Sequence, residues 1–388
     1  MNPLDRTFHD SGVALEHIDG VAAPAVFDSV EAEVAAIRGS VALSAMNHVS
    51  MTAIDGEDAL GFIDRICPRF LHINPNRMKQ TVFINEKGDY LCDAYVCRDK
   101  DGCLLLCRGI ESDAFVSWLL SHKRPLDNIT IRNLNQTHSL LAVNGPFSWE
   151  LMADMHDPEI IGLPYLSFYH PSEDVTVFRA GETGEYGYLV CVPHDRVADS
   201  WEQLLAEGKR YDMARAGLHA LEYCMLENNF FNIRKEGACR DTPAELQIQW
   251  RVSYHKAFLF ADRLKAMREK PLARRITGVY SERTLVEGMP VFGEGDARVI
   301  GTIVNARRFL SGPGHIGLAM IDMPYAVSGI DFYRVNDGEN EAPLLTVSPP
   351  FVNNRSLYVD PQVHAYGDRN SIVFPPVCGI RRLLRNAP

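Results

Sequence analysis

The chain has 388 residues, of which 46% are hydrophobic and 23% charged, and its formal net charge at pH 7 is -11. A chain of this length and composition can bury one large core or two to three smaller ones. The acidic excess opposes binding to nucleic acid and to anionic membranes, and every apolar run is far shorter than the roughly 20 residues of a spanning helix. We therefore expect a globular protein that acts on a small molecule, with no nucleic acid or membrane as partner.

The N-terminus has no charged segment followed by an apolar one, so we expect a cytoplasmic protein. The oligomeric state stays open. Four of the nine cysteines lie close together without C-x-x-C spacing: Cys92, Cys97, Cys103 and Cys107. On a predicted strand, Cys92 and Cys97 would point to opposite faces and could not bind one metal ion. We expect free structural thiols and no metal.

The first half of the chain mixes strands and helices. A turn at 55–58 precedes a predicted amphipathic helix with Leu60, Ile63 and Ile66 on one face. Segments 81–85, 90–97 and 103–107 have the composition of strands joined by tight turns, which predicts a meander of hairpins. Apolar periodicity predicts helices over 110–120, 195–205 and 217–228.

After residue 274, short apolar segments alternate with Gly, Pro and Asp turns, as in a small barrel. We place a domain boundary near 272: residues 1–272 form a core of two segments, about 1–140 and 141–272, and residues 273–388 form an antiparallel β-barrel. The basic run from Arg263 to Arg275 is interpreted as a solvated connector helix. Gly312 to Gly317 has the letters of a dinucleotide fingerprint, but a β-like segment follows it, so we expect a turn.

One stretch is more specific than these patterns. The sequence RAGETGEYGY, from Arg179 to Tyr188, resembles the R-x-G-Y-T-G-E-x-G-[YFW] segment of the glycine-cleavage T-protein (aminomethyltransferase) superfamily. Weaker resemblances to the same family occur in the family's order at 47–49, 85–96, 144–146, 217–227, 243–250, 256–258 and 288–301. Because they are collinear from about residue 30 to 320, the chain is identified as similar to this superfamily.

The resemblance implies an α+β fold: a T-protein-like folate-binding core of two intertwined α/β segments around a central cavity, plus a C-terminal antiparallel β-barrel. It implies tetrahydrofolate as the cofactor. The chain is too short for the dinucleotide domain of the flavin-fused members, so we expect no flavin. The K-G-C-Y-x-G-Q-E signature of the iron-sulfur assembly member is also missing from the sequence.

The chain departs from the family pattern at several polar positions. Leu189 stands where the family has the acidic residue that binds the pterin ring, and a leucine leaves those ring donors unpaired. Leu221 replaces the arginine of the A-R-D segment. Ala45, Cys92 and Gln80 replace further polar residues of the family. Folate use is therefore doubtful, unless another carboxylate such as Glu222 or Glu227 replaces the missing one.

The resemblance also implies site residues. His48, at the S-H-M position, and Asp93, at the second aspartate of the D-D pair, would act as acid and base, and Arg108 would anchor the substrate. The alternatives are a core His48 and a structural ion pair of Arg108 with Asp93 or Glu111. The residues implied to line the cofactor site are Asn144, Glu185, Tyr188, Phe230 and Trp250. Structural roles stay open for Glu185 and Tyr188 in their turn and for Phe230 and Trp250 in the core.

Three functions remain. The first is a one-carbon enzyme, with the aromatic O-demethylase branch as the nearest comparison, that moves a methyl or hydroxymethyl carbon from a small aromatic or anionic substrate to tetrahydrofolate. The second is a folate-independent lyase that releases formaldehyde from a hydroxymethyl-bearing aromatic compound. The third is a binding or assembly module without catalysis. Folate dependence discriminates the first two, and turnover discriminates both from the third.

Overall fold

The computed structural model describes residues 3–10, 12–100, 102–239, 241–293, 295, 298–336 and 341–380. The chain forms two compact units. The first contains residues 1–221, 251–261 and 355–373, and the second contains residues 222–250, 262–354 and 374–388. The units are interleaved along the sequence, so the boundary near 272, with its segments 1–272 and 273–388, stays a prediction.

An eleven-stranded sheet is the centre of the first unit. Its order is β13-β3-β9-β12-β11-β10-β5-β6-β7-β4-β8. The strands are β3 (Ala42–Ala45), β4 (Ser50–Asp55), β5 (Arg77–Ile84), β6 (Tyr90–Arg98), β7 (Gly102–Arg108), β8 (Thr130–Asn133), β9 (His138–Asn144), β10 (Ser167–Ser172), β11 (Val175–Arg179), β12 (Gly187–Pro193) and β13 (Ala214–Arg215). The pairs are antiparallel except β13 with β3.

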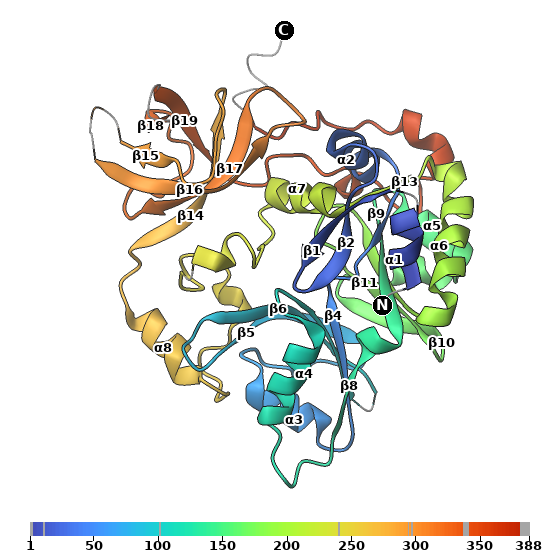
Figure 1. The fold of residues 1–388 in the computed structure, drawn as a ribbon. Coiled ribbons are helices and arrows are strands. Elements are labelled where there is room, and N and C mark those ends of the chain that lie inside the picture. The colour runs from blue at the N-terminus through green and yellow to red at the C-terminus, as the bar shows by residue number, and fades with distance from the viewer. Residues whose placement is uncertain are drawn as a thin grey trace. The chain divides into compact units, whose positions relative to one another are not determined.

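Helices α3 (Ala59–Ile66) and α4 (Ser112–Ser121) cover one face of the sheet (Figure 1). Phe62 of α3 and Phe115 of α4 pack on every second residue of β6 and β7, including Cys92 and Cys107. Side chains alternate between the faces of a strand, so this packing directs Asp93, Tyr95 and Arg108 to the opposite face.

The opposite face encloses a second apolar cluster. It joins Val49 and Met51, near one end of the strand order, to Leu140 of β9 and Leu189 of β12, toward the other end. Cys191 Sγ of β12 lies 3.9 Å from Met51 Sδ of β4, although five strands separate β12 from β4 in the order, so the sheet must curl to bring them together. The sheet is therefore concave on the face that carries Asp93 and Arg108.

Further helices and one hairpin complete the first unit. They are α1 (Pro3–Asp10), α2 (Val30–Gly39), α5 (Ser148–Met155), α6 (His194–Gly208) and the hairpin of β1 (Ala14–Ile18) with β2 (Val21–Val26). The buried carboxylate of Glu33 in α2 accepts hydrogen bonds from the backbone N–H groups of Phe27, Asp28 and Gly217 at 2.6, 3.0 and 2.8 Å. One carboxylate thus ties three segments of chain together.

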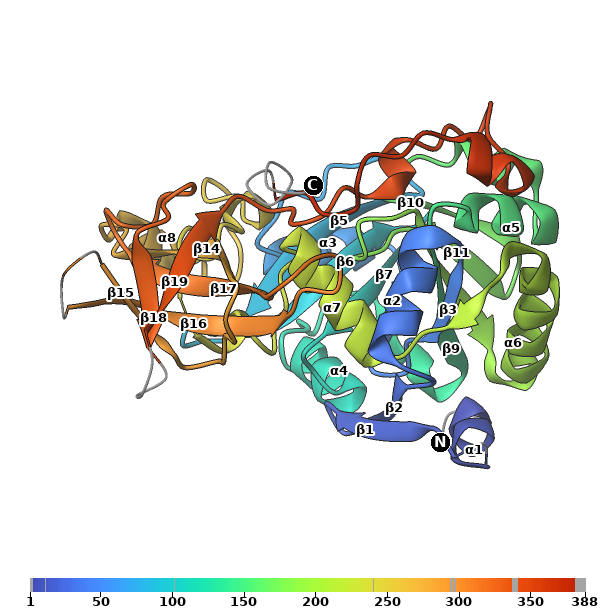
Figure 2. The same cartoon turned by 90° about the horizontal axis from the view of Figure 1, so that it is seen from above.

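The second unit contains a closed barrel with the order β14-β17-β16-β15-β18-β19, in which β14 also pairs with β19 (Figure 2). Its strands are β14 (Arg274–Ser281), β15 (Pro290–Phe292), β16 (Val299–Arg308), β17 (His315–Asp322), β18 (Tyr333–Asn336) and β19 (Glu341–Val347). All pairs are antiparallel, and Val279, Ile303 and Leu344 are among the residues that fill the interior. The predicted α+β fold with a C-terminal antiparallel barrel is confirmed.

Most predicted elements occur where the periodicity places them. The helices predicted over 110–120, 195–205 and 217–228 are α4, α6 and α7 (Leu218–Asn228), and the basic run begins in α8 (Ala261–Glu269). Gly312 to Gly314 form the turn between β16 and β17, as expected. Cys92 and Cys97 do point to opposite faces of β6, and all nine cysteines are free thiols. No helix in the described ranges is long and apolar enough to cross a membrane.

Candidate functional site

Asp93 and Arg108 are neighbours on the concave face of the sheet. They are opposite each other in the register of β6 and β7, and cross-strand partners share one face. The Arg108 guanidinium donates to Asp93 Oδ2 at 3.4 Å. The structure therefore brings together two of the three predicted catalytic residues, and it contains the predicted Asp93–Arg108 ion pair.

Asp93 has a second and closer cationic partner. Arg251, at the end of a short helix at Gln249–Arg251, donates from Nη1 to Asp93 Oδ1. The backbone carbonyl of Arg251 accepts a hydrogen bond of 3.1 Å from the Thr81 hydroxyl of β5, which fixes the start of this segment on the sheet. Both side chains of the pair are almost completely buried, at 2% exposed for Arg251 and 3% for Asp93.

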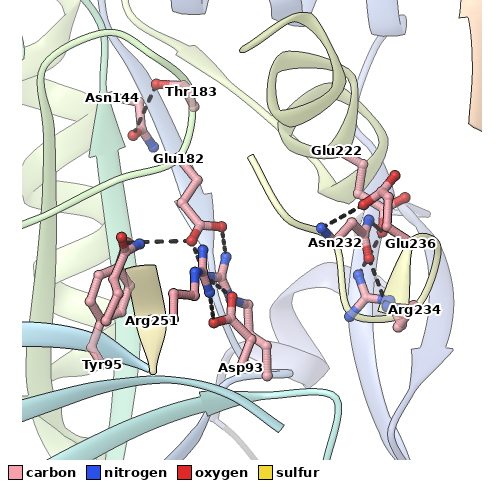
Figure 3. A network of polar contacts seen from close by, with 12 residues as sticks. Asp93, Tyr95, Asn144, Glu182, Thr183, Glu222, Asn232, Arg234, Glu236 and Arg251 are labelled. Carbon is pink, nitrogen blue, oxygen red and sulfur yellow. Dashed lines mark hydrogen bonds and ion pairs between the residues drawn. The ribbon is translucent and has the colours of Figure 1, made fainter. Parts of the chain in front are cut away.

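Arg108 makes its closest contacts with Glu182 and not with Asp93. Both terminal nitrogens of its guanidinium donate to the two carboxylate oxygens of Glu182, which is the bidentate arrangement that suits an arginine fork. Glu182 lies in the loop between β11 and β12, inside the segment that resembles the T-protein motif. Figure 3 shows Glu182, Arg251 and Asp93 beside one another.

Neutral groups surround these four charges. The Tyr95 hydroxyl lies 3.4 Å from Glu182 Oε1 and accepts a 3.0 Å hydrogen bond from the Gln80 amide. Burial raises the pKa of Tyr95, and partial burial raises the pKa of Tyr165, which lies near it. Both phenols therefore stay protonated at neutral pH and can serve as hydrogen-bond donors.

Together these groups form what we call the charged cluster: Asp93, Arg108, Glu182 and Arg251, with Tyr95, Tyr165 and Gln80 beside them. Two carboxylates and two guanidiniums give a formal charge of zero. A buried carboxylate can take up a proton from a substrate hydroxyl group, and cations fixed beside it can stabilise the negative charge that develops on the substrate oxygen. No group of His, Cys, Asp and Glu suited to a metal ion occurs among the described residues.

His48 lies two residues before Ser50 of β4, which pairs with Cys107, the neighbour of Arg108 on β7. It is buried and lines a pocket of about 350 Å³ together with Asp5, Asn135 and Ser139. The described residues that line this pocket include neither Asp93 nor Arg108. The role of His48 as an acid or base stays a prediction.

Two of the predicted cofactor residues, Asn144 and Glu185, make contacts that hold the 179–188 segment. Asn144 Oδ1 accepts a hydrogen bond of 3.5 Å from the Thr183 hydroxyl, and a Cβ at Gly187 would lie 2.9 Å from the same oxygen. The buried Glu185 carboxylate accepts from the Ser356 backbone and hydroxyl at 2.7 Å and pairs with Arg38 at 3.2 Å. These contacts are structural.

Tyr188 points away from the apolar cluster that contains Leu189, because the two residues are consecutive on β12. The Arg179 guanidinium lies 4.8 Å from the centre of the Tyr188 ring, and burial raises the pKa of Tyr188 to about 12. Phe230 and Trp250 belong to the second unit. Phe230 is half-buried and follows the last turn of α7, whereas Trp250 is 49% exposed and therefore does not fill the core.

Leu189 provides a test of whether the site fits tetrahydrofolate. Its side chain is buried among Phe168, Phe178 and Cys191. An apolar residue packed against apolar neighbours offers no acceptor for the N–H donors of a pterin ring. The Glu182 carboxylate, on the same loop-strand segment, is already bound on both oxygens by Arg108. Within the first unit, Leu189 at the family's pterin position and the nearby Glu182 thus offer no free acceptor, and these residues do not fit the pterin ring.

The fold matches a known architecture. The glycine cleavage system aminomethyltransferase T of Bartonella henselae superposes with a TM-score of 0.78 over 91% of this chain and 98% of that chain, at 20% sequence identity. At that identity, the likeness shows the fold alone.

The sequence comparisons show the family. The model of the GCVT N-terminal domain matches residues 4–256, so the chain belongs to this family. An aminomethyltransferase of Pseudothermotoga lettingae is 28% identical over 358 residues, which cover 90% of this chain and 97% of the relative. An aminomethyltransferase of Caldanaerobacter subterraneus subsp. tengcongensis is 26% identical over 339 residues, covering 84% of this chain and 89% of the relative.

Glu182 and Arg251 were not predicted as site residues from the sequence. Glu182 lies within the recognised motif, and Arg251 directly follows the Trp250 of another matching segment. The one sequence feature that could have indicated them is that each is a charged residue within or next to a segment that resembles the family. Neither periodicity nor spacing could show that these two residues meet Arg108 and Asp93, because they are 74 and 158 positions away along the chain.

Proposed function

We propose that the chain is an enzyme that removes a methyl or hydroxymethyl carbon from a small aromatic substrate. The observation that carries the proposal is the charged cluster on the concave face of a fold shared with aminomethyltransferases. Burying an aspartate and two arginines carries a large desolvation penalty, which the ion pairs between them offset only in part. A buried cluster of this kind therefore points to a role beyond stability. Family membership supports one-carbon chemistry as that purpose.

In the proposed reaction, Asp93 accepts the proton of the substrate hydroxyl as the carbon leaves. Arg251 and Arg108 hold the carboxylate in place, since each donates to a different oxygen of Asp93. The phenol group of Tyr165 supplies a hydrogen bond to a second oxygen of the substrate. The chain's own residues thereby bind the substrate, orient it and carry one proton.

The destination of the carbon separates two versions of this function. The curated relatives are named aminomethyltransferases, which supports transfer to tetrahydrofolate as the family's reaction. The buried, apolar Leu189 favours the alternative, a folate-independent lyase. We derive no step through tetrahydrofolate, because the residues at the pterin position do not fit it.

The lyase reaction balances without any co-reactant. A proton first adds to the ring carbon that bears the hydroxymethyl group, and the phenolic O–H loses one, which gives a dienone. Asp93 then removes the O–H proton of the hydroxymethyl group, the oxygen lone pair forms the C=O bond of formaldehyde, and the C–C bond to the ring breaks. The electron pair of that bond restores the aromatic ring, and the phenolic oxygen takes back one proton. A methoxy group, by contrast, is one oxidation level below formaldehyde, so its methyl carbon can leave only to an acceptor.

This difference in oxidation level gives the test. Purified protein is incubated with 4-hydroxybenzyl alcohol and with 4-methoxyphenol, each with and without tetrahydrofolate, and formaldehyde and phenolic products are measured. Formaldehyde from the alcohol without tetrahydrofolate establishes the lyase. Product from 4-methoxyphenol only with tetrahydrofolate establishes the transferase and would mean that another group replaces the missing carboxylate. No product under any condition would favour a binding or assembly module.

A further inference from the structure

The charged cluster leaves no spare positive charge for an anionic substrate. Asp93 is paired with Arg251, and Glu182 is paired with Arg108. The side chains of Arg108 and Glu182 are 15% and 5% exposed, so water screens this second pair poorly. An arginine that binds a substrate carboxylate normally offers its two-nitrogen fork to it. Here Glu182 occupies both terminal nitrogens of that fork.

We propose that Glu182 is a specificity-determining residue that occupies Arg108 and thereby directs the site toward neutral, hydroxyl-bearing substrates and away from carboxylates. This inference rests on the proposed function, in which the charged cluster contacts the substrate. It replaces the expectation that Arg108 anchors an anion.

The energetic reason lies in what a competing carboxylate would have to displace. Glu182 is held near Arg108 by its own backbone, whereas a free ligand also loses translational and rotational freedom on binding. Once displaced, Glu182 would be a buried carboxylate whose remaining described contact is the Tyr95 hydroxyl at 3.4 Å. Leaving a buried charge uncompensated is strongly unfavourable. An anionic substrate therefore binds only against this cost.

A neutral substrate meets no such cost. The groups beside the four charges are the uncharged phenol of Tyr165 and the amide of Gln80, together with Arg69 and Arg179, whose guanidiniums donate to the backbone carbonyls of Gln80 and Gly187. Tyr165 is about half exposed, at 48%, so this side of the cluster is accessible from solvent. A phenol or an alcohol can exchange hydrogen bonds with these groups without changing the charge balance.

The test uses two ligands that differ only in charge, 4-(hydroxymethyl)benzamide and 4-(hydroxymethyl)benzoate, and measures their Kd by calorimetry. The wild-type protein should bind the amide more tightly than the carboxylate. The Glu182→Gln variant frees the Arg108 fork, so its affinity for the benzoate should rise about tenfold or more, as expected for a charge-assisted pair, while the amide changes little.

Two further variants isolate the cause. Glu173→Gln removes one negative charge from an exposed position of the same unit and should leave both Kd values unchanged, which controls for general electrostatics. The double variant Arg108→Met with Glu182→Gln keeps the charge balance and removes the fork. It should bind the benzoate no better than the wild type does, and it replaces the single variant as the test if Glu182→Gln does not fold.

The inference is overturned if the wild type prefers the benzoate, if Glu182→Gln gains no affinity for it, if the double variant keeps that gain, or if the wild type binds neither ligand. Because binding is measured without turnover, the proposed function can fail separately. A charge preference that depends on Glu182, in a protein that converts neither compound, would support the inference and reject the enzyme.

Discussion

Replacing Arg251 by methionine should destabilise the protein strongly, because it leaves Asp93 without its closest cation. Methionine keeps much of the apolar stem of arginine, so the change isolates the charge. The side chains of this pair are only 2% and 3% exposed. Removing one partner of a buried ion pair typically costs about 3–5 kcal/mol. Asp93 keeps a weaker contact with Arg108 at 3.4 Å, so we expect about 3 kcal/mol, at the lower end of that range.

The assay is urea denaturation at pH 7, followed by the fluorescence of the four tryptophans. The double variant Arg251→Met with Asp93→Asn removes one charge of each sign and leaves the Arg108–Glu182 pair balanced. Its loss should fall short of the sum of the two single losses by about 2 kcal/mol. A single-variant loss below about 1 kcal/mol, together with additive effects, would refute the view that the cluster is a coupled, buried ion-pair network.

Three further predictions follow from other buried groups. Glu33→Ala should cost about 2–4 kcal/mol in urea denaturation, because three backbone N–H groups lose their acceptor; a loss under 1 kcal/mol would contradict this. Burial raises the pKa of Glu236 to about 7, so the folded protein binds this proton more tightly than the unfolded chain does. The resulting contribution to the free energy of unfolding is complete below the ordinary pKa of a glutamate and is lost as the pH rises through about 7. The Glu236→Gln variant should therefore lose less stability than the wild type between about pH 5 and 8, and parallel stability curves would count against it. Leu189→Glu should lower the melting temperature because it puts a charge among Phe168 and Phe178, and tetrahydrofolate should not restore it; full restoration by tetrahydrofolate would show that a pterin site is retained.

Most of the fold could be predicted from local patterns. The helix at Ala59–Ile66 and the hairpins of β5, β6 and β7 follow from apolar periodicity and from turn residues such as Gly88, which has a φ of +90°. These signals are local, because the residues that decide them are within one turn or one strand of each other. The curl of the sheet could not be predicted in this way, because it depends on contacts between residues as distant along the chain as Met51 and Cys191.

The candidate site was predictable only in part. Asp93 could be named because it occupies a position that matches a family segment, and Arg108 because an arginine at the end of an apolar strand suits an anionic group. Their hairpin register then brings them together. Their partners could not be named, because Arg251 and Glu182 reach the cluster through loops whose paths no periodicity encodes. His48 was named by the same kind of match as Asp93, yet the pocket that it lines includes neither Asp93 nor Arg108. A matching motif thus identifies a segment, and the fold decides which side chain of that segment faces the site.

The state of Glu236 has a local cause that the sequence also does not show. Its carboxylate accepts hydrogen bonds from the Asn305 amide at 3.1 Å and from the Asn232 backbone at 2.7 Å, and Asn232 also donates to Glu222 at 3.2 Å (Figure 3). The two hydrogen bonds to Glu236 only partly offset the effect of burial on its pKa. Such a group becomes visible only when its partners from distant segments are placed beside it.

The most direct test of the central claim is the rate of one-carbon release by the wild type and by Asp93→Asn on 4-hydroxybenzyl alcohol, with formaldehyde and phenol measured in the same samples. The carboxamide fills nearly the same space but does not accept the substrate proton, so we predict equal amounts of the two products from the wild type and a loss of about 100-fold or more in kcat for the variant. The Kd for the substrate should change far less. Undiminished turnover by a folded Asp93→Asn protein would contradict the assignment of the charged cluster as the reaction centre.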